Sequence, residues 1–146
     1  MKKRIAPYER KTYYYETDRM AIIHHSNYIR WFEEARTNFL EQAGFPYDKM
    51  EKMGVSLPVL VVSCEYLHFL QFNDAISIRL KIENFSGLRM TINYEVINKA
   101  NGKVSAVGKT NHCFVNHEMK PIRLKRDYPE IYQLFADFTE IGSRRA

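Results

Sequence analysis

The sequence is poor in the residues and runs that mark several classes of protein. Its two cysteines, Cys64 and Cys113, lie far apart and form no CxxC pair. Such isolated cysteines favour free thiols in a reducing compartment over a disulfide framework. No apolar run reaches the roughly 18 residues of a membrane span. The charged start MKKRIAPYER lacks the apolar stretch of a signal peptide. We therefore expect a cytoplasmic protein with no membrane span.

Internal repeats, low-complexity segments and Gly/Ser-rich linkers are also missing. The chain has 146 residues, the size of one ordinary domain. A compact domain of this length buries roughly two-thirds of its unfolded surface, which allows a real core. Hydrophobic residues make up 45% and aromatic residues 14%, which argues against disorder. We expect one folded domain over residues 1–146.

The formal net charge is +5, and the basic residues gather in short clusters. These clusters are Lys2–Arg4, Arg10–Lys11, Arg123–Arg126 and Arg144–Arg145. A basic surface attracts nucleic acid, phospholipid or a phosphate-bearing cofactor such as coenzyme A, although it can also be an ordinary solvated surface. The sequence carries no helix-turn-helix, zinc-finger or RNA-recognition pattern, so we do not expect nucleic-acid binding.

Apolar side chains that recur at steps of three and four residues predict a long helix over Ser26–Ala43. The recurring residues are Tyr28, Trp31, Phe32, Ala35, Phe39 and Ala43. Ser26 or Asn27 can cap the first turn. Gly44 stands where helices commonly end.

Strands are predicted after Pro58, where apolar runs and alternation replace the helical period. The predicted strands are Val59–Tyr66, Ala75–Phe85, Leu88–Ile97 and Lys103–Val115, with an earlier one over Tyr8–Glu16; short helices are predicted over Tyr47–Met53 and Asp127–Phe138. Ser86-Gly87 and Asn101-Gly102 are hairpin signals. Strands in hairpin succession form an antiparallel sheet, and a helix with one apolar stripe packs on its inner face. The sequence thus predicts an α+β hot-dog fold, a curved antiparallel sheet wrapped around one long helix.

The stretch TDRMAIIHHSNYIRWFEEAR, Thr17–Arg36, is the part of the chain best suited to chemistry. Asp18 stands just before a tight apolar turn that runs into the start of the long helix. The N-terminus of a helix carries unpaired N–H groups and partial positive charge. A carboxylate that faces such an end across a slot for a carbonyl can attack or deprotonate, while the amides hold a developing oxyanion.

The residues of this stretch resemble a known family signature. They are Tyr15-Glu16-Thr17-Asp18, Ile22-Ile23-His24-His25-Ser26-Asn27-Tyr28 and Phe32-Glu33-Glu34-Ala35-Arg36. They are similar to the hot-dog acyl-CoA thioesterases of the 4-hydroxybenzoyl-CoA thioesterase type, whose pattern runs roughly T-D-x-x-G-[IV]-V-x-H-x-N-Y. The sequence departs at Ala21, where that family usually carries Gly. Gly permits a positive φ, so Ala21 either keeps an ordinary conformation in the turn or narrows the slot.

The resemblance implies an acyl-CoA thioesterase that releases a carboxylic acid and free CoA. Asp18 would be the nucleophile or the general base. The backbone N–H of His25 would polarise the carbonyl, while its imidazole assists or lines the slot. No cofactor is implied, because a thioester is already activated. The pair His24-His25 has no third ligand at metal-type spacing, so we expect no metal site, and we expect His24 to face the other way.

Five other residues are candidates for substrate binding or for support of the site. Asn27 and Tyr28 are expected to pack or hydrogen-bond the first helical turn, and Asn27 either orients Asp18 or acts as a plain cap. Arg79, Lys81 and Arg89 are candidate contacts for the phosphates of CoA; exposed strand charges that only aid solubility are the alternative reading.

Two other functions stay open at this point. They are hydrolysis of acyl-carrier-protein thioesters, which a basic rim would also suit, and a non-catalytic acyl-CoA binding module on the same fold. The resemblance also implies a homodimer or homotetramer, in which paired sheets let the partner complete the slot beside Asp18. Exposed sheet edges are often covered by a neighbour, and most oligomers are symmetric.

Overall fold

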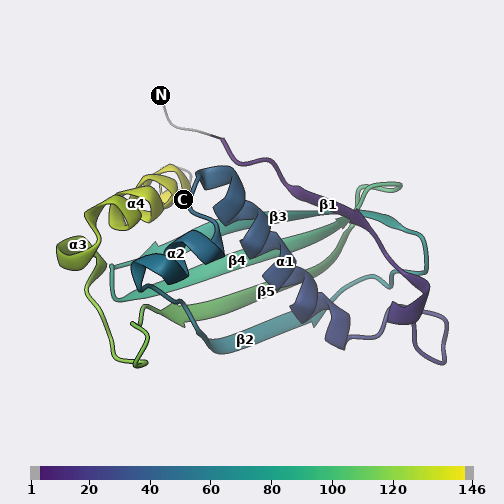
Figure 1. Ribbon diagram of the computed structural model, residues 1–146. Helices are drawn as coiled ribbons and strands as arrows, with labels where there is room; N and C mark the ends of the chain where they lie inside the picture. Colours follow the sequence, from purple (N-terminus) through teal and green to yellow (C-terminus); the bar gives the residue numbers. More distant parts are fainter. Residues whose placement is uncertain (1–3, 144–146) are drawn as a thin grey trace.

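A curved sheet wraps around one long helix in the computed structural model of the protein, which describes residues 4–143 (Figure 1). The sheet has five antiparallel strands in the order β1-β3-β4-β5-β2. The strands are β1 (Tyr8–Lys11), β2 (Val59–Tyr66), β3 (Ala75–Phe85), β4 (Arg89–Asn98) and β5 (Val104–Cys113). The helices are α1 (Ser26–Ala43), α2 (Tyr47–Met53), α3 (Leu124–Asp127) and α4 (Pro129–Ser143), with a short 3-10 helix η1 (Tyr14–Glu16). The predicted α+β hot-dog fold is confirmed.

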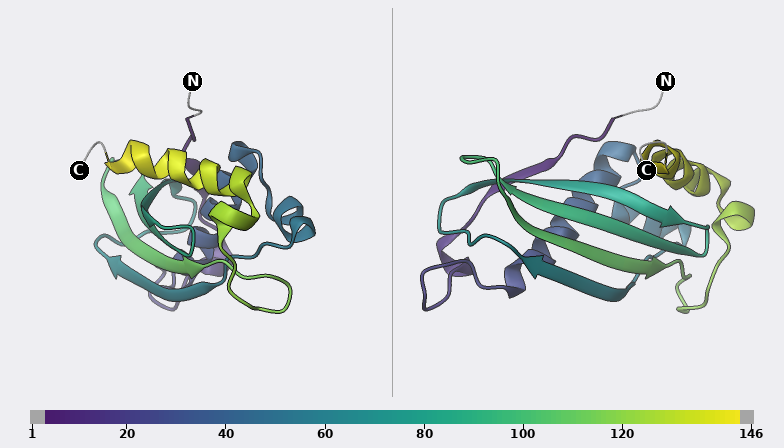
Figure 2. Two further views of the ribbon diagram at one scale, coloured as in Figure 1. Left: turned by 90° about the vertical axis from the view of Figure 1, so that its left-hand side faces the viewer. Right: turned by 180° about the vertical axis from the view of Figure 1, so that it is seen from behind.

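The apolar stripe of α1 packs on the inner face of the sheet. The Phe32 ring stacks on the Tyr94 ring of β4, with centroids 4.4 Å apart. A Cβ on Gly108 of β5 would lie 2.4 Å from the Phe32 ring, so only glycine lets α1 approach the sheet this closely. On the opposite, outer face of the sheet, no helix of residues 4–143 crosses the strands (Figure 2, right). The sheet therefore has one packed face and one solvated face.

Most element boundaries follow the sequence pattern, with two corrections at the ends of the chain. The strand predicted over Tyr8–Glu16 is wrong in its second half, because β1 ends at Lys11 and η1 follows. The Glu16 carboxylate accepts the Tyr13 N–H at 2.8 Å, which turns the chain into η1 in place of an extended strand. The helix predicted over Asp127–Phe138 is two helices, α3 and the longer α4.

The place of β2 in the sheet also differs from the expected hairpin succession. β3, β4 and β5 are consecutive antiparallel neighbours, but β2 pairs with β5, with Ser63 opposite Lys109. The chain therefore crosses the sheet between β2 and β3, and on the way the Leu70 carbonyl accepts the N–H of Ile23 at 2.8 Å. This crossing fixes the segment just before α1.

As an edge strand, β2 exposes a row of aliphatic side chains. Val59, Leu60, Val61 and Val62 are 43%, 45%, 56% and 38% exposed. Such an unpaired apolar edge is one that proteins normally cover.

Two expectations concern cysteines and membrane spans. Both Cys64 and Cys113 are free thiols, as predicted. Within residues 4–143, we find no helix with the length and apolar character needed to cross a membrane.

Candidate active site

Asp18 lies in a tight turn that leads from η1 toward the start of α1. The Asp18 N–H donates to the Ile22 carbonyl (2.8 Å), and the Ala21 N–H donates to the Asp18 carbonyl (3.0 Å). The Met20 N–H donates to Asp18 Oδ1 at 2.8 Å, an Asx turn that fixes the carboxylate. The other carboxylate oxygen accepts no hydrogen bond from residues 4–143. That oxygen is available to a substrate carbonyl or to water.

Ala21 adopts the left-handed conformation that the turn requires. Its φ is 64°, in a region where residues with a Cβ are uncommon. Of the two readings that the sequence left open, an ordinary conformation is therefore wrong. The left-handed conformation costs a non-glycine residue roughly 1–2 kcal/mol. The turn keeps the shape that glycine would give it, with a methyl group added.

The first turn of α1 is held by His24, and the predicted cap is wrong. The N-cap residue is His25, without a side-chain cap. His24 Nδ1 accepts the Ser26 N–H at 3.1 Å, and the His24 carbonyl accepts the Asn27 N–H at 3.1 Å. The imidazole of His24, one residue before the N-cap, thus accepts a hydrogen bond from a free N–H of the first turn, as a Ser or Asn cap would.

The backbone N–H of His25 is left without a hydrogen-bond partner in the described part of the chain. It lies at the N-terminus of α1, where the helix dipole adds partial positive charge. The His25 side chain is exposed, and its ring stacks on His24 with centroids 4.2 Å apart. The expectation that His24 faces the other way is therefore wrong. A free amide of this kind can donate to an oxyanion.

Two aromatic residues pack at the start of α1. The Tyr66 hydroxyl, at the end of β2, donates to the His25 carbonyl at 2.9 Å. Partial burial raises the pKa of Tyr66 to about 12, so the hydroxyl keeps its proton. The buried Tyr28 ring packs against Tyr66 and Trp31, with centroids 5.0 and 4.7 Å away. Tyr28 thus packs in the first turn of α1, as expected, and a contact between Tyr28 and a substrate stays a prediction.

Asn27 ties the segment around Asp18 to the start of the helix. Its side-chain Nδ2 donates to the Glu16 carbonyl at 2.9 Å and to the His24 carbonyl at 3.2 Å. The amide therefore acts as a donor between two backbone segments, whereas a cap would accept. Between the two readings left open by the sequence, the geometry favours orientation of the loop that carries Asp18.

Sequence reasoning missed Glu16 and Tyr66. Glu16 is buried and contacts both η1 and α1. An acidic residue in a tyrosine-rich stretch gives no local signal of burial. Tyr66 meets His25 across 41 residues of sequence, a contact that no local pattern encodes.

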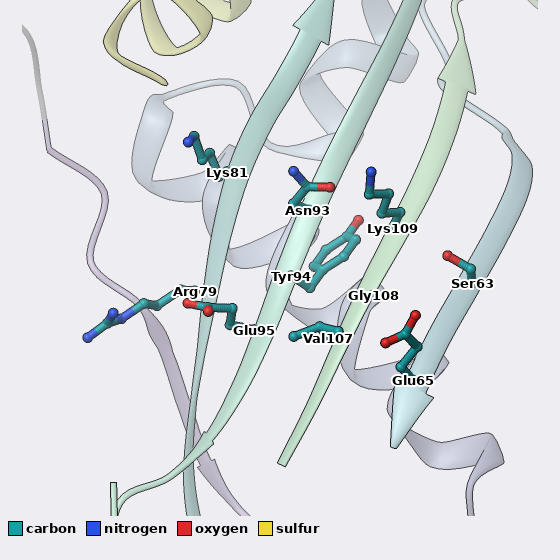
Figure 3. Close-up of a pocket in the computed structure, with 10 residues that line it drawn as sticks. All are labelled: Ser63, Glu65, Arg79, Lys81, Asn93, Tyr94, Glu95, Val107, Gly108 and Lys109. Carbon is teal, nitrogen blue, oxygen red and sulfur yellow. The ribbon is translucent and has the colours of Figure 1, made fainter. Parts of the chain in front are cut away.

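Arg79 and Lys81 lie on the outer face of the sheet, across the sheet from α1 (Figure 3). They line a hollow of about 440 Å³ together with Lys109, Asn93 and Glu95. In a single chain, the sheet separates this hollow from α1.

Arg89 begins β4, next to the turn at Ser86. This turn lies beside α3, at the opposite end of the molecule from the Asp18 turn (Figure 1). Within one chain, His25, Asn27 and Tyr28 lie at the start of α1 and Asp18 lies in the turn before it, whereas the three basic candidates lie elsewhere.

The chemistry of the site is that of a carboxylate and a helix N-terminus. Within residues 4–143 there is no group of three or more His, Cys, Asp or Glu side chains arranged to hold a metal ion. The described groups suited to chemistry are the free Asp18 oxygen and the free His25 amide.

The sequence of this chain matches a known protein family. Residues 14–135 match the thioesterase-like superfamily. YneP of Bacillus subtilis, named provisionally as an acyl-CoA thioesterase, is 34% identical over 118 residues, which cover 80% of this chain and 85% of YneP.

Two solved structures extend the comparison. The DHNA-CoA thioesterase of Staphylococcus aureus superposes with a TM-score of 0.89 at 30% identity, over 97% of this chain and 95% of that one. The gentisyl-coenzyme A thioesterase BH1999 gives a TM-score of 0.77 at 25% identity, over 88% and 98% of the two chains. The chain described here therefore belongs to the thioesterase-like superfamily and is a thioester hydrolase with the hot-dog fold.

Proposed function

We propose that this protein hydrolyses acyl-CoA thioesters to a free carboxylic acid and CoA, with Asp18 as the reacting carboxylate. The observation that carries the proposal is that one short segment before α1 holds both the Asp18 carboxylate, with one oxygen free, and the His25 amide at the helix N-terminus, which has no partner among residues 4–143. The names of the relatives support the same substrate class.

The proposed chemistry needs only groups that the chain supplies. Either Asp18 attacks the thioester carbonyl, expels CoA thiolate and forms an anhydride that water then opens, or Asp18 takes a proton from a water that attacks directly. Both routes pass through a tetrahedral oxyanion, which the His25 N–H and the α1 dipole would stabilise. Water supplies the oxygen of the acid and the proton that converts the expelled thiolate to the CoA thiol.

We also propose a homodimer, or a homotetramer built from it, in which a second copy covers β2. The exposed aliphatic row on β2 and its unpaired edge support this assembly. Tyr66 ends the same strand and touches His25, so a chain added at this edge would lie next to the site.

Arg79, Lys81 and Arg89 remain proposed contacts for the CoA phosphates. Arg89 begins β4, and the start of β4 lies at the opposite end of the molecule from the loop that precedes α1 (Figure 1). Because of that separation, its contact with a substrate at this site would have to come from a second copy. Substitution of Arg89 by Ala should then raise KM for CoA thioesters and leave kcat nearly unchanged.

The test is release of free thiol from a panel of acyl-CoA thioesters, followed with a thiol reagent. The panel should vary chain length and include the gentisyl thioester, and matched acyl-carrier-protein thioesters should be run beside it. Turnover with a preference for CoA thioesters is the expected result. Preference for the carrier protein would favour the alternative substrate, and binding without thiol release would favour a non-catalytic module.

A further inference from the structure

The Glu16 carboxylate joins three elements beneath the candidate site. Its Oε1 accepts Arg10 Nη2 of β1 and the Tyr13 N–H, each at 2.8 Å, and its Oε2 accepts Trp31 Nε1 of α1 at 2.9 Å. The Glu16 side chain is only 5% exposed. Three donors from three segments thus converge on one buried group.

Only an ionised carboxylate of this length satisfies the three donors. Both Glu16 oxygens must accept, so an amide in either orientation would turn its NH₂ toward another donor. An aspartate is one methylene shorter and would lose the reach to at least one segment. The charge is compensated by Arg10, whose guanidinium lies over the rings of Tyr13 and Trp31 at 4.7 and 5.1 Å.

The backbone of the same residue holds the other side of the site. The Glu16 carbonyl accepts the His24 N–H at 2.8 Å and Asn27 Nδ2 at 2.9 Å. Asp18 follows two residues later in the chain. Glu16 therefore binds α1 through its side chain, the start of α1 through its carbonyl, and Asp18 through the covalent chain.

We infer that Glu16 is a positioning residue that sets the separation between the Asp18 carboxylate and the His25 amide. This inference rests on the proposed function, since it assigns Glu16 to the same reaction. Glu16 itself has no free oxygen for a substrate, so it acts through the groups that it holds. A misplacement of about 1 Å at a reacting pair costs on the order of 10²-fold in rate.

The chain offers a readout that does not depend on activity, because Trp31 is its one tryptophan. The indole N–H of Trp31 gives a single NMR signal, and its hydrogen exchange reports on the bond to Glu16 Oε2. In Glu16→Gln we expect this exchange to speed up by about tenfold or more, as a local contact opens.

Glu34→Gln is the matched control. Glu34 also binds Arg10, at 3.0 Å, and its side chain is 41% exposed. The Glu34→Gln variant should leave the indole signal of Trp31 unchanged.

The kinetic test uses the same two variants on the best acyl-CoA of the panel. We expect Glu16→Gln to lower kcat by about 10- to 100-fold with KM within about threefold, and Glu34→Gln to stay within about twofold. The pH profile of Glu16→Gln should keep the wild-type shape, because Glu16 exchanges no proton in the reaction. A folded Glu16→Gln with wild-type kcat would overturn the inference, whether its indole contact is opened or unaltered.

A change in the shape of the pH profile would also overturn the inference, because Glu16 would then take part in the proton transfer and not only hold other groups in place. If Glu16→Gln fails to fold, Trp31→Phe removes a single donor and keeps an aromatic ring. It should lower kcat in the same direction, and a folded Trp31→Phe with full kcat would contradict the role of the α1 contact. A wild-type protein without thioesterase activity would defeat the proposed function and leave the indole result standing.

Discussion

At the scale of single residues, Ala21 is the position where the backbone departs most from ordinary geometry near the site. Ala21→Gly removes the strain of the positive φ, roughly 1–2 kcal/mol, but it also frees the unfolded chain, which costs about 0.4–1 kcal/mol, so the two effects partly cancel. We expect a free energy of unfolding between that of wild type and about 1.5 kcal/mol above it. Ala21→Val should lose more than about 1 kcal/mol, because β-branched residues fit this region poorly. Urea unfolding of both variants checks this, and equal stabilities would contradict it.

For single residues, the sequence motif predicts which positions lie near the start of α1 better than it predicts what each side chain binds. Asp18, His25, Asn27 and Tyr28 were predicted from spacing and resemblance. In the structure, His25, Asn27 and Tyr28 lie at the start of α1 and Asp18 lies in the turn before it, while their roles in the reaction stay predictions. Their hydrogen-bond roles were harder to predict. The cap is provided by His24, because its ring nitrogen, one residue before the N-cap, accepts the Ser26 N–H. Such geometry depends on how the loop folds back, which residue type alone does not determine.

At the scale of elements, β5 contains a buried titratable group. His112 is fully buried between the Leu57 carbonyl (3.1 Å) and the Thr110 hydroxyl (2.8 Å). Burial lowers the pKa of His112 to about 4, below the ordinary value of about 6.5. The unfolded chain therefore takes up this proton first as the pH falls. Stability from this residue should be full above about pH 6.5 and should be lost toward pH 4, by up to about 3 kcal/mol.

His112→Gln removes the titrating group and keeps a side chain that can hydrogen-bond. We expect the variant to lose much of the decline in unfolding free energy between about pH 6.5 and pH 4. Exposed His117→Gln is the control and should keep the wild-type decline. Urea unfolding at a series of pH values measures both. The same decline in His112→Gln as in wild type would refute the assignment.

Elements with strong local signals were predicted closely. The bounds of α1 match the prediction, because a clear apolar period ends at Gly44, whose φ is 92°. β1 was predicted too long, because Glu16 folds its own segment into η1. The partner of β2 could not be read from its sequence, because strand order depends on contacts between distant segments. The apolar run of β2 is typical of an interior strand, yet β2 lies at an edge.

At the scale of the whole molecule, the uncovered β2 edge leads to a prediction about assembly. Light scattering at micromolar protein should give at least twice the chain mass of 17.4 kDa. Val61→Lys places a charge in the middle of the exposed row and should shift the protein toward monomer. Leu88→Lys is the matched control. It makes the same kind of change at a 46% exposed residue in the turn between β3 and β4, neither of which pairs with β2. A fully active wild-type monomer would contradict both the interface and a site shared between copies.

The central claim is that Asp18 carries the reaction, and one comparison of rates tests it most directly. Asp18→Asn keeps the shape of the turn and removes the charge needed for attack or proton abstraction. With its fold checked by circular dichroism, it should lose about 10²–10⁴-fold of the acyl-CoA hydrolysis rate. His25→Ala should lose less, because the proposed oxyanion donor is a backbone amide. A folded Asp18→Asn that retained more than about a tenth of the wild-type rate would contradict the account.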